Sequence, residues 1–104
     1  MNKEIKSKFY IFYIFINGNY IITSNRESGE GRYDVCLEPF DKDKPAFIME
    51  FKSCKDTSFE KAIASGKKQI KDKKYEIDLR QRKCTNIKKM IFAFKGKRVK
   101  IESF

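Results

Sequence analysis

The two prolines of the chain constrain its fold more than any other feature. Pro39 and Pro45 bound the polar residues 40–44. Because proline has no backbone N–H and cannot donate to a strand ladder, the two mark the ends of neighbouring strands. We predict these strands over residues 33–38 and 46–52. A simple antiparallel hairpin between them is symmetric about Lys42.

The predicted hairpin brings two acidic residues together. In the register that places Pro39 opposite Pro45, Asp34 lies opposite Glu50. Like charges directly opposite one another destabilise a sheet, so folding alone does not explain the pair. A divalent cation removes the repulsion, because Mg²⁺ accepts hard oxygen ligands from one or two carboxylates. The alternative interpretation is a solvent-exposed cluster of cross-strand charges.

Lys52 completes the candidate site. Side chains alternate along a strand, so Glu50 and Lys52 project from the same face, roughly 7 Å apart at their Cα atoms. A cation beside a metal can orient or deprotonate an attacking water, or stabilise charge in a phosphoryl transition state. The three residues are therefore typical of a metal-assisted hydrolysis site, provided that no bulge shifts the register.

The other segments predict a mixed α/β domain. Residues 58–75 have helical spacing, with Thr57 or Ser58 as the N-cap. We expect strands over residues 20–23, 88–94 and 98–102, and a polar loop over 25–32. One stripe of the helix is expected to pack on the sheet: Phe59, Ala62, Ile63, Gly66 and Ile70. Strands separated by a helix favour a central sheet.

The N-terminal apolar run, residues 9–16, is too short to span a bilayer and is not followed by a small-residue cleavage site. We expect a buried element and no membrane association. Cys36, Cys54 and Cys84 are odd in number, and the chain contains no His. Neither a disulfide framework nor a zinc site is indicated, so a reduced cytoplasmic location is expected.

The net charge of +10, from 24 Lys and Arg against 14 Asp and Glu, favours a polyanionic partner. Two stripes of the helix are candidates for contacts to phosphate groups, one with Lys67, Lys71 and Lys74 and the other with Lys61 and Lys68. AT-rich coding can produce the same bias toward lysine, and a lysine stripe can also be a solvated surface.

The strings SNRESGEGRYD at residues 24–34 and FIMEFK at residues 47–52 carry a family resemblance. The sequence resembles the PD-(D/E)XK nuclease superfamily, and more narrowly the nuclease-like domain found C-terminal to AAA-ATPase-like domains. The resemblance continues through residues 68–75 and 91–97, so it covers most of the chain. The long first string is far more specific than an Asp followed by Glu-X-Lys.

This resemblance implies one domain, residues 1–104, with a restriction-endonuclease-like αβββαβ core and a mixed sheet flanked by helices. It also makes the run at 9–16 a helix. Asp34 and Glu50 would bind Mg²⁺ or Mn²⁺, with the Phe51 carbonyl as a further ligand. Lys52 would assist the water, and Gln69 would face the site from the helix.

The implied activity is metal-dependent hydrolysis of phosphodiester bonds in nucleic acid, with DNA favoured over RNA. Arg32 either forms an ion pair with Glu27 or contacts substrate. Because one domain reaches only one strand of a duplex, a homodimer is also expected. The alternatives are a non-catalytic nucleic-acid-binding or regulatory module of the same fold, and an interaction domain for an ATPase-like partner.

Overall fold

The predicted hairpin lies at the centre of the fold. The computed structural model describes residues 18–27, 32–72 and 74–104. Strand β2 (Arg32–Pro39) ends at the first proline, and β3 (Ala46–Ser53) begins just after the second. The two strands pair antiparallel with Asp34 opposite Glu50, which is the predicted register.

Three further strands extend the hairpin into a mixed sheet, as predicted. They are β1 (Tyr20–Glu27), β4 (Ile87–Lys95) and β5 (Arg98–Ser103). Among the described residues the strand order is β1-β2-β3-β4-β5, with β3 and β4 parallel and the other pairs antiparallel. Placing all of residues 25–32 in a loop was wrong, because β1 pairs with β2 as far as Glu27 opposite Arg32.

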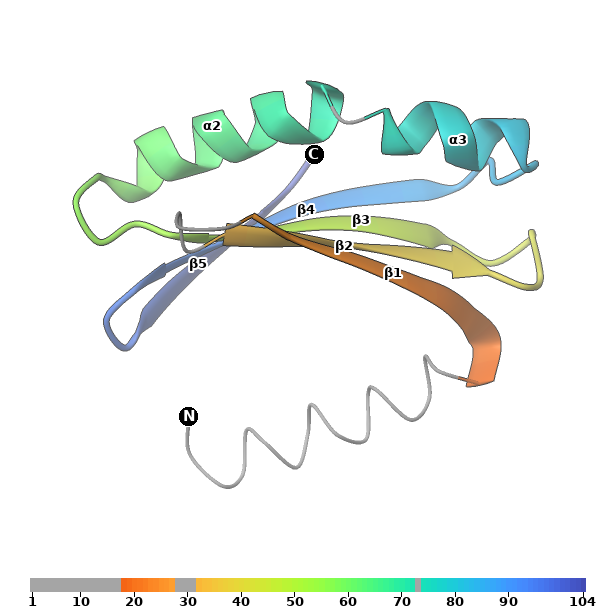
Figure 1. Cartoon of the computed structure of the whole chain (residues 1–104), viewed down its shortest axis with the longest axis horizontal. Helices are drawn as coiled ribbons and strands as arrows, with labels where there is room; N and C mark the ends of the chain where they lie inside the picture. The colour runs from red at the N-terminus through yellow and green to blue at the C-terminus, as the bar shows by residue number, and fades with distance from the viewer. Residues whose placement is uncertain (1–17, 28–31, 73) are drawn as a thin grey trace.

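Two helices lie on one face of this sheet (Figure 1). Helix α2 (Phe59–Asp72) begins after Ser58, whose Oγ accepts a hydrogen bond from the Lys61 backbone N–H at 3.2 Å, so Ser58 is the N-cap. The prediction that this helix continues to Tyr75 was wrong. Lys74 adopts a left-handed backbone conformation, with φ of 60°, and a separate helix α3 (Tyr75–Gln81) follows it.

The core lies between these helices and the sheet. The predicted stripe of α2 faces inward: Ala62, Ile63 and Ile70 are buried, and Phe59 packs against the same cluster. The sheet contributes Ala46, Ile48, Ile91 and Ala93. At Gly66 the helix approaches β4 so closely that a Cβ atom would meet Ile91 side-chain carbons at 3.0 Å. A side chain at this position would therefore require the Ile91 side chain to shift by a few tenths of an ångström.

The three cysteines are buried and free. Burial raises the pKa of Cys36 to about 11, which keeps this thiol protonated and unreactive. Within the described part of the chain, no helix is both long and apolar enough to cross a membrane. The predicted first helix, residues 9–16, lies outside the described residues. The assignment of residues 1–104 to one domain stays a prediction.

Candidate active site

The centre of the candidate site is a pair of carboxylates withdrawn from water. Asp34 on β2 is 0% exposed and Glu50 on β3 is 1% exposed. Their Cα atoms are direct partners across the antiparallel ladder, and Ile91 on β4 is the next partner of Glu50. The expectation of solvent-exposed charges at these two positions is therefore excluded. Two buried, adjacent carboxylates repel each other in a medium of low dielectric, which favours a bound cation.

Lys52 follows Glu50 on the same face of β3 and reaches helix α2. Its Nζ atom donates a hydrogen bond to Ser65 Oγ at 2.7 Å and another to Gln69 Oε1 at 3.1 Å. Ser65 and Gln69 are one helical turn apart, so both project from the same side of α2. The helix thereby fixes the position of the ammonium group. Gln69, predicted to face the site, contacts it through Lys52.

Tyr75 fixes the other side of the carboxylate pair. Its hydroxyl donates a hydrogen bond to Asp34 Oδ1 at 2.7 Å. Tyr75 is the first residue of α3, so the break after α2 is what delivers this side chain. Sequence reasoning missed the contact, as it missed Ser65, because both depend on how the helices cross the sheet. The nearest sequence signal was the polar, lysine-rich segment that ends at Tyr75.

The remaining predicted site residues are only partly gathered here. The Phe51 ring stacks on Phe92, with 4.7 Å between ring centroids, on the opposite face of the sheet, so only its backbone carbonyl could serve as a ligand. Arg32 lies opposite Lys52 in the ladder. Lys67 and Lys71 line a separate groove.

The chemistry of the donor set fits a hard divalent cation. No group of three or more His, Cys, Asp or Glu side chains gathers around a possible metal position among residues 18–27, 32–72 and 74–104. The candidate site thus offers two charged ligands, Asp34 and Glu50. Mg²⁺ and Mn²⁺ suit such a set, because these ions accept few carboxylates and complete their coordination with water or substrate phosphate oxygens.

Glu38 shows how this chain neutralises a buried carboxylate that has a structural role. Its Oε2 atom accepts a hydrogen bond from Lys42 Nζ at 2.8 Å, and Oε1 accepts one from Arg82 Nε at 2.6 Å. Burial alone raises the pKa of Glu38, but these two cations outweigh it and hold the pKa below its ordinary value. The ion pairs join the β2–β3 turn to the segment after α3.

Comparison with known proteins agrees with the family resemblance. The sequence profile of the PD-(D/E)XK nuclease superfamily matches residues 2–104, nearly the whole chain. No curated protein and no solved structure matches. The resemblance seen in the two sequence strings is therefore confirmed, and the mixed sheet with helices is consistent with the expected restriction-endonuclease-like fold. The association with an ATPase-like domain stays a prediction.

Proposed function

We propose that this chain, which belongs to the PD-(D/E)XK nuclease superfamily, hydrolyses phosphodiester bonds of DNA at Asp34, Glu50 and Lys52. The observation that carries the proposal is the register of β2 and β3. It sets two buried carboxylates side by side and places Lys52 one step further along the same face. A sheet gains no stability from this arrangement, but a cation-dependent hydrolase needs it.

Asp34 and Glu50 would hold Mg²⁺ or Mn²⁺, with the Phe51 carbonyl as a further ligand. When bound, the metal would polarise water and offset the negative charge of the phosphate. In the reaction, the water oxygen adds to phosphorus, one P–O ester bond breaks, and a water proton ends on the leaving oxygen. Lys52 orients that water and stabilises the negative charge that develops on the phosphoryl oxygens.

Three neighbours serve as positioning residues. Ser65 and Gln69 hold the Lys52 ammonium through hydrogen bonds of 2.7 and 3.1 Å. Tyr75 holds one oxygen of Asp34 through a hydrogen bond of 2.7 Å and so fixes the orientation of that carboxylate. Because well-placed groups cost no reorganisation during the reaction, a loss of positioning lowers the rate even when the charged groups remain.

The positive charge of the chain supports nucleic acid as the substrate, with Lys67, Lys71 and Arg32 as candidate phosphate contacts. We extend the proposal to a cytoplasmic location, which the buried free thiols suit. Cutting both strands of a duplex would require two copies of the chain, so a homodimer is part of the proposal for duplex substrates.

Metal-dependent cleavage of labelled DNA tests the function. We expect cleavage with Mg²⁺ or Mn²⁺ and none in EDTA. Glu50→Gln and Lys52→Ala should each lower the rate at least about 100-fold, the effect of removing a group that stabilises transition-state charge. Glu60→Gln is the matched control, because it makes the same change at an exposed carboxylate in the first turn of α2 and should leave the rate unchanged.

Salt-sensitive DNA binding without cleavage by the wild-type chain would refute catalysis and favour the non-catalytic binding module. Cleavage that survives in both Glu50→Gln and Lys52→Ala would refute the site. Absence of both binding and cleavage at low salt would favour an interaction domain.

A further inference from the structure

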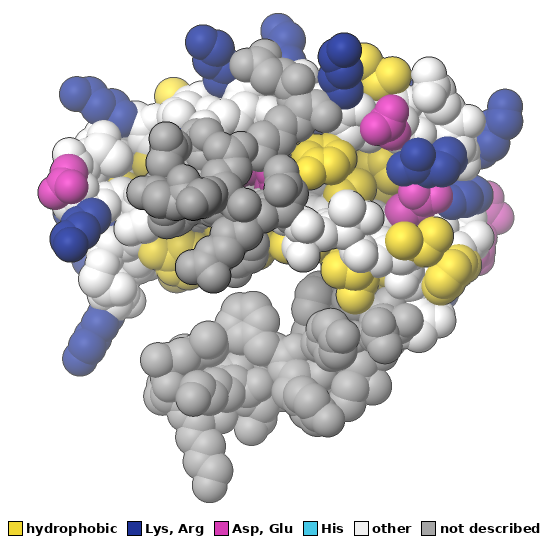
Figure 2. Space-filling model, in the orientation of Figure 1, with side chains coloured by type: hydrophobic (Ala, Val, Ile, Leu, Met, Phe, Trp, Pro, Cys, Tyr) yellow, Lys and Arg dark blue, Asp and Glu magenta, His cyan; other side chains and the backbone are white. Residues whose placement is uncertain are grey.

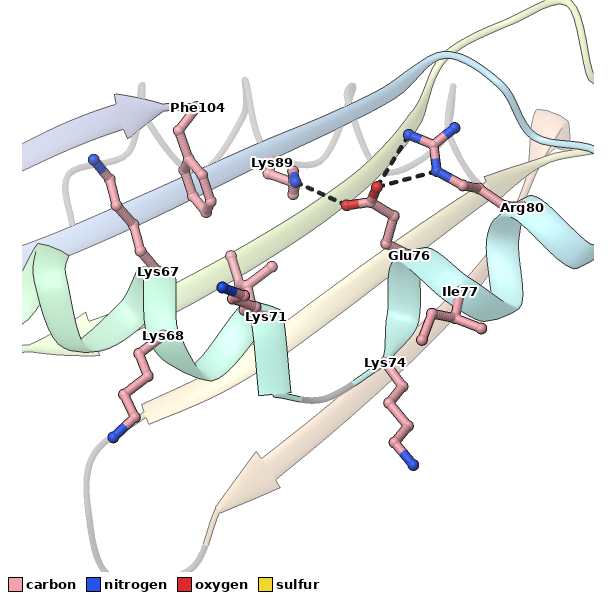
Figure 3. A pocket seen from close by; sticks show the side chains of 10 residues that line it. Lys67, Lys68, Lys71, Lys74, Glu76, Ile77, Arg80, Lys89 and Phe104 are labelled. Carbon is pink, nitrogen blue, oxygen red and sulfur yellow. Dashed lines mark hydrogen bonds and ion pairs between the residues drawn. The ribbon is translucent and has the colours of Figure 1, made fainter.

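A groove lies along the side of α2 that bears Lys67 and Lys71 (Figure 3). Helical periodicity places these two residues on the side opposite Ser65 and Gln69, which contact Lys52. The groove encloses about 690 Å³, within the range of pockets that hold small ligands. We call it the basic groove. Its character comes from five lysines and one aromatic ring: Lys67, Lys68, Lys71, Lys74, Lys89 and Phe104. Figure 2 shows that Lys and Arg side chains also gather along the edge of the molecule where α2 and α3 lie.

The charge of the basic groove is only partly neutralised. Glu76 lies in it but already accepts hydrogen bonds from Lys89 at 2.7 Å and Arg80 at 3.0 Å, and these bonds lower its pKa. Lys67 pairs with Glu102 at 3.0 Å. The other three lysines form no ion pair within the described part of the chain: Lys68, Lys71 and Lys74. The groove therefore carries excess positive charge that suits phosphate groups.

Phe104 gives the basic groove a flat apolar platform. Phe104 is 44% exposed as a residue, and the Nζ atoms of Lys67 and Lys89 lie over its ring, 5.4 and 5.5 Å from the ring centroid. The backbone N–H of Phe104 donates to the Lys89 carbonyl at 3.0 Å, so the residue is anchored to β4. In Figure 3 the ring lies between these two lysines. An exposed ring flanked by cations is the combination that binds an unstacked base and its phosphates.

We propose that the basic groove binds single-stranded nucleic acid, with a base stacked on Phe104 and the lysines contacting phosphates. In a duplex both faces of each interior base are already stacked. The lysines could therefore contact the phosphates of a duplex, but Phe104 could not stack on its interior bases. This inference rests on the proposed function, because it specifies that the substrate of the nuclease is single-stranded. Binding to the groove itself requires no hydrolysis.

The position of the basic groove connects it to the candidate active site. Helix α2 contributes Ser65 and Gln69 to the site and Lys67 and Lys71 to the groove. The two regions are thus separated by about 10 Å, the width of one helix. At the start of α3, Tyr75 contacts Asp34 while the next residue, Glu76, lines the groove. A strand held in the groove would lie one helix width from the carboxylates.

Fluorescence anisotropy without divalent metal tests the proposal. The probes are a labelled oligothymidine of about 15 nucleotides and a duplex of the same length. Phe104→Leu should weaken binding of the single strand roughly tenfold, because stacking on an aromatic side chain contributes about 1–3 kcal/mol per base. Duplex affinity should change less than about twofold. Phe40→Leu, at a 62% exposed phenylalanine in the β2–β3 turn, is the matched control and should change neither affinity.

Equal weakening of both probes by Phe104→Leu, or no change in either, overturns the proposal, as does a wild-type chain that prefers the duplex. Thermal denaturation of each variant identifies a loss of folding, and in that case Phe104→Tyr must retain the affinity for the single strand. Cleavage assays report separately on the proposed function. Single-strand binding that depends on Phe104, with no cleavage, would support the groove and refute the nuclease activity. Cleavage with no dependence of single-strand binding on Phe104 would refute only the groove.

Discussion

Helix α2 separates two regions of opposite character. On its inner side Asp34 and Glu50 are buried, negative, and fixed in place by strand register and by Tyr75. On its outer side the basic groove is positive, and long flexible side chains supply its charge. Bond cleavage needs a few groups in fixed positions, whereas affinity for a polyanion depends mainly on the density of positive charge. Changes to the two regions should therefore affect different measured quantities.

Among the variants that separate the two regions, removal of groove charge has the largest expected effect. The triple variant Lys67→Ala, Lys71→Ala and Lys74→Ala should weaken DNA binding about tenfold or more at moderate salt and flatten the salt dependence of the affinity. Cleavage at saturating substrate should stay close to wild type, since Lys52 is untouched. Binding isotherms at several salt concentrations measure this. An unchanged salt slope would show that the groove does not contact phosphates.

A second prediction concerns the repulsion between the buried carboxylates. Asp34→Asn removes one charge while the amide oxygen can still accept the Tyr75 hydrogen bond. Without metal, the variant should have a higher free energy of unfolding than wild type, by about 1–3 kcal/mol, because a buried charge is removed. Chemical denaturation in EDTA measures the difference, and added Mg²⁺ should stabilise only the wild type. A variant that is less stable than wild type in EDTA would contradict repulsion between the two carboxylates.

Tyr75→Phe separates positioning from charge. The variant loses the hydrogen bond that positions Asp34, and because a misplaced catalytic group can lower a rate by up to about 100-fold, the cleavage rate should fall roughly tenfold. Tyr20→Phe is the matched control: it removes the 2.8 Å hydrogen bond from Tyr20 to the Pro45 carbonyl at the far end of the hairpin. The control should alter stability but not the rate once folded. Equal rates for the two variants would remove Tyr75 from the site.

The smallest effect concerns Glu38, the buried carboxylate that has cationic partners. Glu38→Gln makes the same kind of change as Asp34→Asn but should lower the free energy of unfolding at neutral pH, by about 1 kcal/mol, because Lys42 and Arg82 are themselves partly exposed. The pKa of Glu38 is depressed in the folded chain, so its contribution is present above the unfolded pKa of about 4.3.

That contribution disappears as the pH falls through the lower folded pKa of Glu38. The stabilities of wild type and Glu38→Gln should therefore converge in acid. Denaturant unfolding at several pH values measures the convergence. Two results would contradict the distinction between the two kinds of buried carboxylate. One is a stability difference between wild type and Glu38→Gln that does not change with pH, and the other is a change of the same sign in the free energy of unfolding for Glu38→Gln and Asp34→Asn.

The sequence predicted the hairpin and its acid pair because those depend on local signals. Two prolines fix the strand ends, and side-chain alternation then fixes which residues share a face. The inward stripe of α2 was predictable for the same reason, since Ala62, Ile63 and Ile70 recur at helical spacing.

Long-range contacts were not predictable. The break at Lys74 has no glycine or proline to mark it, and only the break delivers Tyr75 to Asp34. The basic groove joins α2, α3, β4 and the residue that follows β5, so no single segment of sequence reveals it. The extra length of β1 arises in the same way, because its pairing with β2 overrides the turn-forming residues.

Calorimetric titration of the metal-free chain with Mn²⁺ tests directly whether Asp34 and Glu50 bind a metal ion, because it requires no substrate. Wild type and Glu60→Gln should bind about one ion per chain with equal affinity. Glu50→Gln should lose at least about tenfold in affinity, since even the outer partners of metal ligands are worth that much. Equal affinity in all three proteins, or no binding by the wild type, would contradict the assignment of Asp34 and Glu50 as a metal centre.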